Sequence, residues 1–279
     1  MSFIIRKILP KEIKIFIDWA EKEGWNPGLH DDRPFLFCDP AGFLVGELEG
    51  EIIATKSAVR YGQEFGFMGF YIVKPEFRGK GYGYQIWKAG FERLSDIPSG
   101  MDGVVAQQHN YIKSGYEFAY RQIRFEGVEI IPKKSFEVKP IVEADLCNLL
   151  DYDKTIFPAN RAAFIKEWVS MPESLTLKVE NGVQIQGYGT IRKCYNGGYK
   201  VGPLFADDYD IAKKLFLALV DFAEGKPVYL DTPEINPQAI QLAKEFNMES
   251  VFETARMYNG GNPERDREKI FGVTTFELG

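Results

Sequence analysis

Histidine and cysteine are scarce in this chain of 279 residues. It contains two histidines, His30 and His109, and three cysteines, Cys38, Cys147 and Cys194. These residues lie far apart in the sequence and show none of the spacings that hold a metal ion. We therefore expect no metal centre. The few, scattered cysteines indicate a reducing, cytoplasmic environment.

An excess of positive charge and long apolar runs are also missing. The 40 acidic residues outnumber the 34 lysines and arginines, and both signs are mixed along the chain, with a formal net charge of -6. Proteins that bind a nucleic-acid backbone usually carry a basic patch, so a nucleic acid is not an expected partner. No apolar run approaches the roughly 20 residues that cross a bilayer, and the first residues lack the pattern of a secretory signal. We expect no membrane partner.

The composition and length suit a globular protein with two domains. Hydrophobic residues make up 45% of the chain and aromatic residues 14%, without a long polar tract, so a compact core can form. Because a domain usually contains roughly 100–150 residues, this length favours two domains. Turn-forming and charged residues interrupt the apolar periodicity around Pro132, and the pattern of segments then starts again. We predict one domain at residues 1–130 and a second at residues 131–279.

Strand-like and helical segments alternate in both halves, which predicts a mixed α/β (α+β) fold. In the first half we predict strands at residues 3–9, at two runs between 42 and 60, at 65–73 and at 102–106, and a strand pair near 118–125. Helices are predicted after Pro10, at residues 81–94, and as a short turn around Asn110. In the second half we predict strands at 136–141, 183–191, 199–205 and 228–231, and helices from 143, 211 and 238. The similar order of segments suggests a duplication.

A glycine-rich loop, from Val73 to Gly83, joins the predicted strand 65–73 to the predicted helix 81–94. Free N–H groups at a helix N-terminus bind a diphosphate where no Cβ intervenes, and Arg78 and Lys80 add positive charge. A Walker loop is excluded because no Gly-Lys-Ser/Thr end is present. A dinucleotide fingerprint is excluded because Tyr84 takes the place of its third glycine. A plain connector between a strand and a helix is the alternative.

The loop also satisfies a third signature, Arg/Gln-x-x-Gly-x-Gly/Ala, through Arg78, Gly81 and Gly83. In this respect residues 3–126 resemble the GCN5-related N-acetyltransferase (GNAT) superfamily. The resemblance implies a mostly antiparallel central sheet flanked by helices, with acetyl-CoA as the cofactor. It also implies that the strand before the loop separates from the next strand and bonds the pantetheine arm through its backbone. The cofactor contacts implied here are Ile72, Val73, Arg78, Gly79, Lys80, Gly81, Tyr82, Gly83 and Asn110.

A second matching element runs from Tyr111 to Tyr116. Its sequence, Tyr-Ile-Lys-Ser-Gly-Tyr, resembles a superfamily element whose first tyrosine often protonates the departing thiolate of coenzyme A. Tyr111 is therefore the predicted general acid, because a phenol with a pKa near ~10 is protonated at neutral pH. The alternative is a core aromatic residue with a satisfied hydroxyl group. The general base is poorly marked, because residues 65–73 contain no acidic side chain; His109 or a chain of water molecules could serve.

The acceptor site in this superfamily is usually shaped by the loop after the first helix. Here that loop contains Trp25, Asn26, His30 and Asp31, and Trp25 could form an apolar wall. The alternative is a polar turn with a packed tryptophan.

The corresponding loop of the second half, residues 204–210, has neither the arginine nor the glycines. It places Asp207, Asp208 and Asp210 where a diphosphate would lie, so it should repel the cofactor. The layout resembles tandem proteins in which a degenerate acetyltransferase-like domain follows a catalytic one. The resemblance implies an N-acetyltransferase that transfers an acetyl group from acetyl-CoA to a small-molecule or protein amine by direct attack, as a monomer or homodimer. A non-catalytic acetyl-CoA sensor and an interaction protein are the alternatives.

Overall fold

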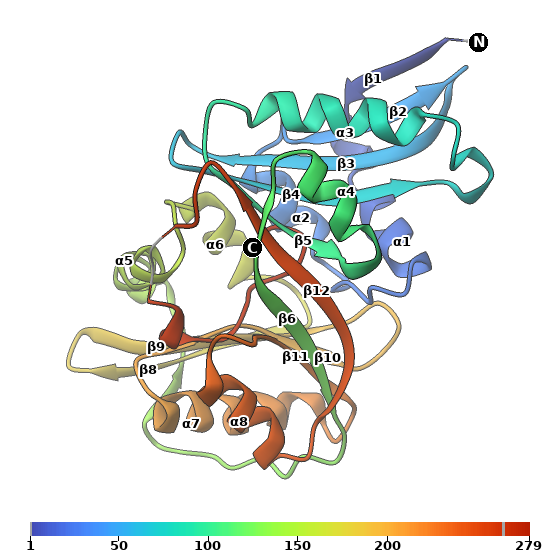
Figure 1. The fold of residues 1–279 in the computed structure, drawn as a ribbon. Helices are drawn as coiled ribbons and strands as arrows, with labels where there is room; N and C mark the ends of the chain where they lie inside the picture. Colours follow the sequence, from blue (N-terminus) through green and yellow to red (C-terminus); the bar gives the residue numbers. More distant parts are fainter. Residues whose placement is uncertain (1, 264–265) are drawn as a thin grey trace.

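A computed structural model describes residues 2–263 and 266–279 and shows two halves built from strands and helices (Figure 1). The first half contains β1 (Phe3–Lys7), α1 (Lys14–Lys22), α2 (Asp32–Cys38), β2 (Phe43–Leu48), β3 (Glu51–Tyr61), β4 (Phe65–Val73), α3 (Tyr82–Arg93), β5 (Ser99–Val104), α4 (Gln108–Lys113) and β6 (Glu117–Gly127). The second half contains β7 (Val138–Pro140), α5 (Leu146–Ile156), α6 (Ala162–Trp168), β8 (Ser174–Asn181), β9 (Gln184–Lys193), β10 (Tyr199–Ala206), α7 (Tyr209–Leu219), β11 (Val228–Pro233), α8 (Pro237–Glu245), β12 (Glu249–Asn259) and β13 (Ile270–Gly272). No helix in these described ranges is long and apolar enough to cross a membrane.

The strands form one sheet in the order β1-β2-β3-β4-β5-β12-β6-β11-β10-β9-β8-β7, with β13 paired to β10. Within the described part of the chain, the parallel neighbours are β4 with β5 and β10 with β11, and the other pairs are antiparallel. Each half therefore has one parallel pair within a mostly antiparallel sheet that is flanked by helices. The predicted fold class is confirmed.

Strand β12 connects the two halves. Although it lies late in the sequence, it pairs with β5 and β6 of the first half, and β6 also pairs with β11 of the second half. Figure 1 shows β6 and β12 running together from one half to the other. The prediction of a strand pair near residues 118–125 is wrong, because this segment is the single strand β6. Both of its edges pair with strands of the second half, so no local hairpin partner is needed.

Helices α2 and α6 and strands β8, β12 and β13 were not anticipated from the sequence. Each of the two helices has seven residues, which is too short for a clear helical periodicity. The two helices nevertheless meet in the core, where Phe35 of α2 stacks on Trp168 of α6 with ring centroids 6.3 Å apart.

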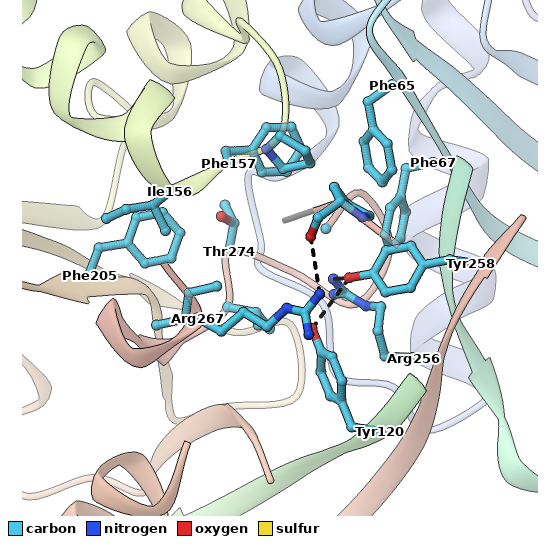
Figure 2. A pocket seen from close by; sticks show the side chains of 15 residues that line it. Phe65, Phe67, Tyr120, Ile156, Phe157, Phe205, Arg256, Tyr258, Arg267 and Thr274 are labelled. Atoms are coloured by element: carbon cyan, nitrogen blue, oxygen red, sulfur yellow. Dashed lines mark hydrogen bonds between the residues drawn. The ribbon is translucent and has the colours of Figure 1, made fainter. Parts of the chain in front are cut away.

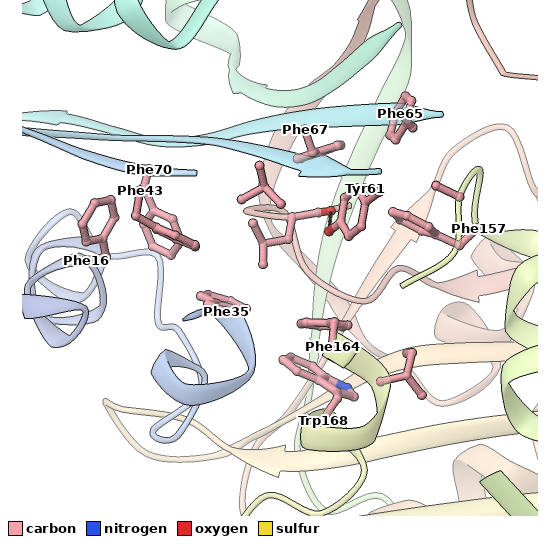
Figure 3. Packing of buried hydrophobic residues seen from close by; sticks show 14 of the residues in the cluster. Phe16, Phe35, Phe43, Tyr61, Phe65, Phe67, Phe70, Phe157, Phe164 and Trp168 are labelled. Carbon is pink, nitrogen blue, oxygen red and sulfur yellow. Dashed lines mark hydrogen bonds between the residues drawn. The ribbon is translucent and has the colours of Figure 1, made fainter. Parts of the chain in front are cut away.

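One aromatic core extends across both halves (Figure 3). Phe16 packs edge-to-face against Phe43 and Phe70, with ring centroids 5.2 and 5.5 Å apart. From the second half, Phe164 and Trp168 complete the same cluster. Burying a side chain of this size stabilises a fold by about 1.5–3 kcal/mol. The relative position of the halves is therefore set by packing as well as by the shared sheet.

Two buried ion pairs also join the halves. Arg124 of β6 donates two hydrogen bonds to Asp231 of β11, at 2.6 and 2.8 Å. Arg192 of β9 binds Asp31, the residue before α2, at 2.8 and 3.3 Å. Buried charges persist where they are paired and hydrogen-bonded, and removal of one partner typically costs about 3–5 kcal/mol. These pairs fix the orientation of the loop before α2 against the second half.

Candidate active site

The parallel strands β4 and β5 pair over a short stretch and then separate. The described pairing joins residues 66–68 to residues 99–101, and β4 continues for five residues beyond it. A bulge marks the point of separation, because Phe70 has a positive φ of 47° and the register of β4 against β3 shifts there. Thr55 Oγ1 donates to the Phe70 carbonyl at 3.0 Å, and Lys56 Nζ donates to the Gly69 carbonyl at 3.1 Å. Two side chains of β3 thus hold the bulge in place.

The glycine loop after β4 leaves the N-terminus of α3 uncovered. Gly79 and Gly81 have φ values of 74° and 86°, and no atom lies within 4 Å of the position where a Cβ would stand at either residue. Gly81 immediately precedes α3, and no side chain caps this helix end. No side chain therefore satisfies the first N–H groups of this 12-residue helix, which gives the helix end its anion-binding character.

The other predicted loop residues have identifiable local partners. Arg78 binds Glu23, the residue after α1, and donates from Nε to the Val73 carbonyl at 2.8 Å. Tyr82 packs on Phe3, with ring centroids 4.8 Å apart. A Cβ at Gly83 would lie 2.6 Å from Tyr71 Oη. Gly83 therefore allows α3 to lie close to β4, whereas Gly79 and Gly81 adjoin empty space. Lys80 lies 5.4 Å from the centre of the Phe77 ring, and Ile72 and Val73 stand opposite Thr55 and Ala54 of β3.

A groove of about 810 Å³ lies between α3 and α4. Asn110 and Tyr111 line it from α4, and Trp87 and Lys88 line it from α3. A smaller cavity of about 50 Å³ lies beside it, in the gap between β4 and β5, and Tyr71 and Tyr111 line both spaces. We call this smaller space the β4–β5 cavity. It has room for a few water-sized groups, so it suits the reacting ends of substrates.

Tyr111 is the sequence-predicted catalytic residue at this junction. Its side chain is 5% exposed and stacks on Trp87, with ring centroids 5.1 Å apart. Burial raises the pKa of the Tyr111 phenol, and the neighbouring Tyr71 raises it further. The hydroxyl group therefore stays protonated at neutral pH and is available as a donor.

Three side chains that the sequence did not single out also line the β4–β5 cavity: Lys56 of β3, Thr254 of β12 and Glu277 near the C-terminus. Lys56 is fully buried, and burial holds its pKa well below the ordinary range. Thr254 Oγ1 is buried and has no hydrogen-bond partner within the described residues. The sequence carries one signal for Lys56, since a lysine in the middle of an apolar strand needs an explanation. It carries none for Thr254.

The loop after α1 is divided between the cavity and the second half. Trp25 lines the β4–β5 cavity, and its carbonyl accepts a hydrogen bond from Arg124 at 2.6 Å. Asn26 instead accepts from the Asn196 N–H at 3.0 Å, and His30 pairs with Glu173 at 3.1 Å. Asp31 is occupied by Arg192, as described above. His109 is exposed on α4 and does not line the cavity.

A second cavity, of about 40 Å³, lies between the two halves and contains none of the predicted site residues (Figure 2). Aromatic side chains surround it, and Tyr120 and Tyr258 are hydrogen-bonded there at 3.3 Å. Arg256 lines this cavity, and its ion-pair partner Asp102, at 2.6 and 2.7 Å, lines the β4–β5 cavity. The ion pair therefore lies between the two cavities.

In the second half, side chains of the loop that corresponds to the glycine loop occupy the N-terminus of α7. Asp208 caps α7 by accepting a hydrogen bond from the Ile211 N–H at 2.9 Å. Asp207 accepts from Tyr152 Oη at 3.1 Å and pairs with Lys269 at 3.1 Å. An anion at this helix end would meet carboxylates in place of free N–H groups.

Two family profiles match the chain, one in each half. The profile described as "Acetyltransferase (GNAT) family" matches residues 11–110, and the one described as "Acetyltransferase (GNAT) domain" matches residues 149–272. A relative described as holothin acyltransferase, from Pseudoalteromonas sp. (strain SANK 73390), is 32% identical over 271 residues, which cover 96% of this chain and 92% of that protein.

Solved structures show the same fold. A putative acetyltransferase from Pyrococcus horikoshii superposes with a TM-score of 0.85 at 21% identity and covers 100% of this chain and 96% of its own. A tandem GNAT protein from the clavulanic acid biosynthesis pathway gives a TM-score of 0.64 at 12% identity, over 94% of this chain and 100% of its own.

Proposed function

The chain belongs to the GNAT acetyltransferase family and is an acyltransferase, and from this premise we propose that it transfers an acetyl group from acetyl-CoA to an amine by direct attack. The observation that carries the proposal is that the α3–α4 groove and the β4–β5 cavity are neighbours, because Tyr71 and Tyr111 line both. A long donor in the groove would bring its reactive end to the predicted acid.

The residues of the glycine loop fit a diphosphate. Gly79 and Gly81 leave open the space that a Cβ would fill, and the uncapped first turn of α3 offers N–H groups and a positive dipole. We propose that the backbone from Arg78 to Gly83 holds the diphosphate of coenzyme A, and that Lys80 adds charge. When bound, acetyl-CoA supplies a thioester carbon for attack and a thiolate as the leaving group.

The gap between β4 and β5 fits the pantetheine arm. The Lys74 N–H donates to the Ile53 carbonyl of β3 at 2.9 Å. Because pairs alternate between hydrogen-bonded and non-hydrogen-bonded in an antiparallel ladder, the peptide groups of the next pair, Val73 with Ala54, point away from each other. Val73 therefore faces the gap beside β5. We propose that Val73, with its neighbour Ile72, contributes backbone contacts to the arm, and that Asn110 contributes from α4.

Tyr111 is the proposed general acid. Its raised pKa keeps the phenol protonated while the carbon–sulfur bond breaks, so that a proton can pass from Tyr111 Oη to the departing sulfur. The acceptor nitrogen would approach from the opposite side of the cavity, where Trp25 forms part of the wall. Asn26, His30 and Asp31 would act by holding this loop against the second half.

The wider organisation follows from these assignments. We propose that the coenzyme contacts all lie in a catalytic half, residues 1–130, and that residues 131–279 form a degenerate half that completes the acceptor side. A cytoplasmic location and a monomeric or homodimeric state accompany the proposal. The acceptor is a small-molecule or protein amine, and holothin, after which the relative is named, belongs in the first set of compounds to test.

The test is a thiol-release screen with acetyl-CoA and a library of amines, run beside a calorimetric titration with coenzyme A alone. The proposal expects binding of one coenzyme A per chain and thiol release with at least one amine. Binding without turnover on any amine or peptide would favour a non-catalytic sensor. Absence of both would favour an interaction protein.

A further inference from the structure

We propose that Glu277, near the C-terminus of the second half, is the general base that takes the proton from the acceptor amine. This assignment rests on the proposed function. It supplies the basic group that the strand β4 lacks, since residues 65–73 contain no carboxylate.

The backbone around Glu277 is anchored to the bulge of β4. The carbonyl of Glu277 lies 2.2 Å from the position that a Cβ at Gly69 would occupy, so the two segments are in direct contact. Tyr61 Oη donates to the Leu278 carbonyl at 2.7 Å, and Thr275 Oγ1 accepts from the N–H groups of Glu277 and Leu278 at 3.2 and 2.9 Å. The backbone of Glu277 is thereby held at the point where β4 and β5 separate.

Glu277 lines the same cavity as Tyr111, and its carboxylate has no hydrogen-bond donor among the described residues. Its side chain is 5% exposed, and among residues 2–263 and 266–279 no hydrogen bond to its carboxylate oxygens is found. The two cations that act on Glu277 already have partners: Lys200 Nζ donates to the Asn26 carbonyl, and Arg124 donates to Asp231 and to the Trp25 carbonyl. Buried carboxylates normally have hydrogen-bond partners, so this one is available to a substrate.

Its electrostatic surroundings suit a base that works near neutral pH. Burial raises the pKa of Glu277, whereas Lys200 of β10 and Arg124 of β6 lower it; Asp31, before α2, and Asp231 of β11 raise it. A carboxyl group with a raised pKa accepts a proton more readily than an exposed glutamate does.

Two orphaned hydroxyl groups are independent evidence for a ligand at this place. Thr254 lines the cavity, and its Oγ1 is buried without a hydrogen-bond partner among the described residues. Ser57 Oγ is also buried without a partner and lies 3.0 Å from the position that a Cβ at Gly69 would occupy. Buried hydroxyl groups in native structures are nearly always hydrogen-bonded. An amine or amide group bound in the β4–β5 cavity would give Thr254 Oγ1 a partner.

The other carboxylates near the cavity are already in use. Asp102 is bound by Arg256 through both oxygens, and Asp31 by Arg192 in the same way. The proton transfers then balance. The acceptor nitrogen loses one proton to Glu277 as it forms the bond to the acyl carbon, the carbon–sulfur bond breaks with its electron pair going to sulfur, and Tyr111 protonates the sulfur. Glu277 afterwards releases its proton to water, and Tyr111 takes one up.

The experiment compares Glu277→Gln with the wild type on a weakly basic amine, whose own ionisation lies below the pH range measured. Glu277→Gln is expected to bind coenzyme A with unchanged affinity and to lose roughly 10²–10⁴ in kcat, and the fall of wild-type activity toward low pH should disappear. Glu268→Gln is the matched control, because Glu268 lies in the same C-terminal segment but lines neither the β4–β5 cavity nor the α3–α4 groove. This variant should behave like the wild type.

A second variant separates catalysis from folding. Glu277→Asp keeps the negative charge near Lys200 and Arg124 and withdraws the carboxylate by one methylene group, so it should keep the low-pH limb at a reduced kcat. The assignment is wrong if Glu277→Gln retains that limb, or if its loss of turnover equals the fraction unfolded in the same buffer. No turnover by the wild type on any amine would overturn the proposed function as well, whereas a fully active Glu277→Gln would overturn this assignment alone.

Discussion

Replacing Lys56 by methionine should stabilise the protein at neutral pH and change how its stability depends on pH. The Lys56 ammonium is fully buried, donates to the Gly69 carbonyl at 3.1 Å, and lies 5.0 Å from the centre of the Trp87 ring. No carboxylate within the described ranges forms an ion pair with it. Burial without a counter-charge lowers the pKa of Lys56 well below its ordinary value of 10.5.

The sign of the pH effect follows from proton uptake on unfolding. Between the lowered pKa in the folded state and a pKa of about 10.4 in the unfolded chain, Lys56 is neutral when folded and protonated when unfolded. The free energy of unfolding therefore rises with pH in this window, by up to about 1.4 kcal/mol for each pH unit. Below the window the folded state bears the full cost of the buried charge. The advantage of Lys56→Met is consequently greatest at low pH and shrinks as the pH rises.

The loss of one hydrogen bond offsets part of this gain. A bond to the Gly69 carbonyl contributes about 0.5–1.5 kcal/mol, or up to about 3 kcal/mol when the donor is charged. Urea unfolding of both proteins at several values between pH 6 and pH 10 would measure the difference. Lys88→Met, at an exposed position of α3, is the matched control and should change stability by less than about 0.5 kcal/mol. Parallel curves for the wild type and Lys56→Met would refute the reasoning, because they would mean that Lys56 titrates alike in both states.

Two further predictions concern the donor site. Gly81→Leu should abolish coenzyme A binding, because a side chain would fill the open space at the start of α3. Because residue 81 has a positive φ, a leucine there should also cost about 1–2 kcal/mol of stability. Asp208→Leu, at the matching helix end, should lose about 1 kcal/mol of capping energy but leave the calorimetric affinity unchanged; a large loss there would indicate a second site. Tyr111→Phe should keep that affinity and lower kcat and kcat/KM together by roughly 10²–10⁴, with loss of a high-pH limb that the raised pKa places above pH 10. An unchanged kcat in steady-state assays would make Tyr111 a packing residue.

The local structure around the proposed donor site was predictable because it depends on residues that are close in the sequence. The predicted strand at residues 65–73 coincides with β4, and the predicted helix at 81–94 differs from α3 by one residue at each end. Gly79 and Gly81 adopt the left-handed conformation that favours glycine, and both adjoin open space. The geometry of a short loop between a strand and a helix depends mainly on its own residues, so the sequence predicts the shape of this loop.

The acceptor side was less predictable because its residues act over long separations. Asn26 and Asp31 have partners 170 and 161 residues away in the sequence. The loop pattern identifies such residues as polar, but it does not tell whether they face a substrate or another part of the same chain. Of the four loop residues proposed from the sequence, Trp25 lines the β4–β5 cavity.

Lys56 and Glu277 line the β4–β5 cavity but were not predicted as site residues from the sequence. Lys56 lies in β3 among residues that are largely buried, so a lysine there could be recognised as unusual. Its position beside the cavity, however, depends on the bulge in β4. Glu277 follows a buried segment, and its place depends on how that segment crosses to the first half. Such a crossing leaves no periodic signal in the sequence.

The order of strands makes the proposed chemistry a property of both halves together. Along residues 99–104, the edge of β5 that faces away from β4 is paired with β12, which brings Phe252 and Thr254 to the cavity. Tyr111 comes from the first half, whereas Glu277 comes from the last residues of the second. An acid and a base placed on separate halves would keep their distance only if the halves could not move apart. The insertion of β12 between β5 and β6, with the shared aromatic core, supplies that constraint, because separation would break backbone pairing on both sides of β12. The proposed chemistry therefore requires the second half, although the loop of that half lacks the arginine and the glycines.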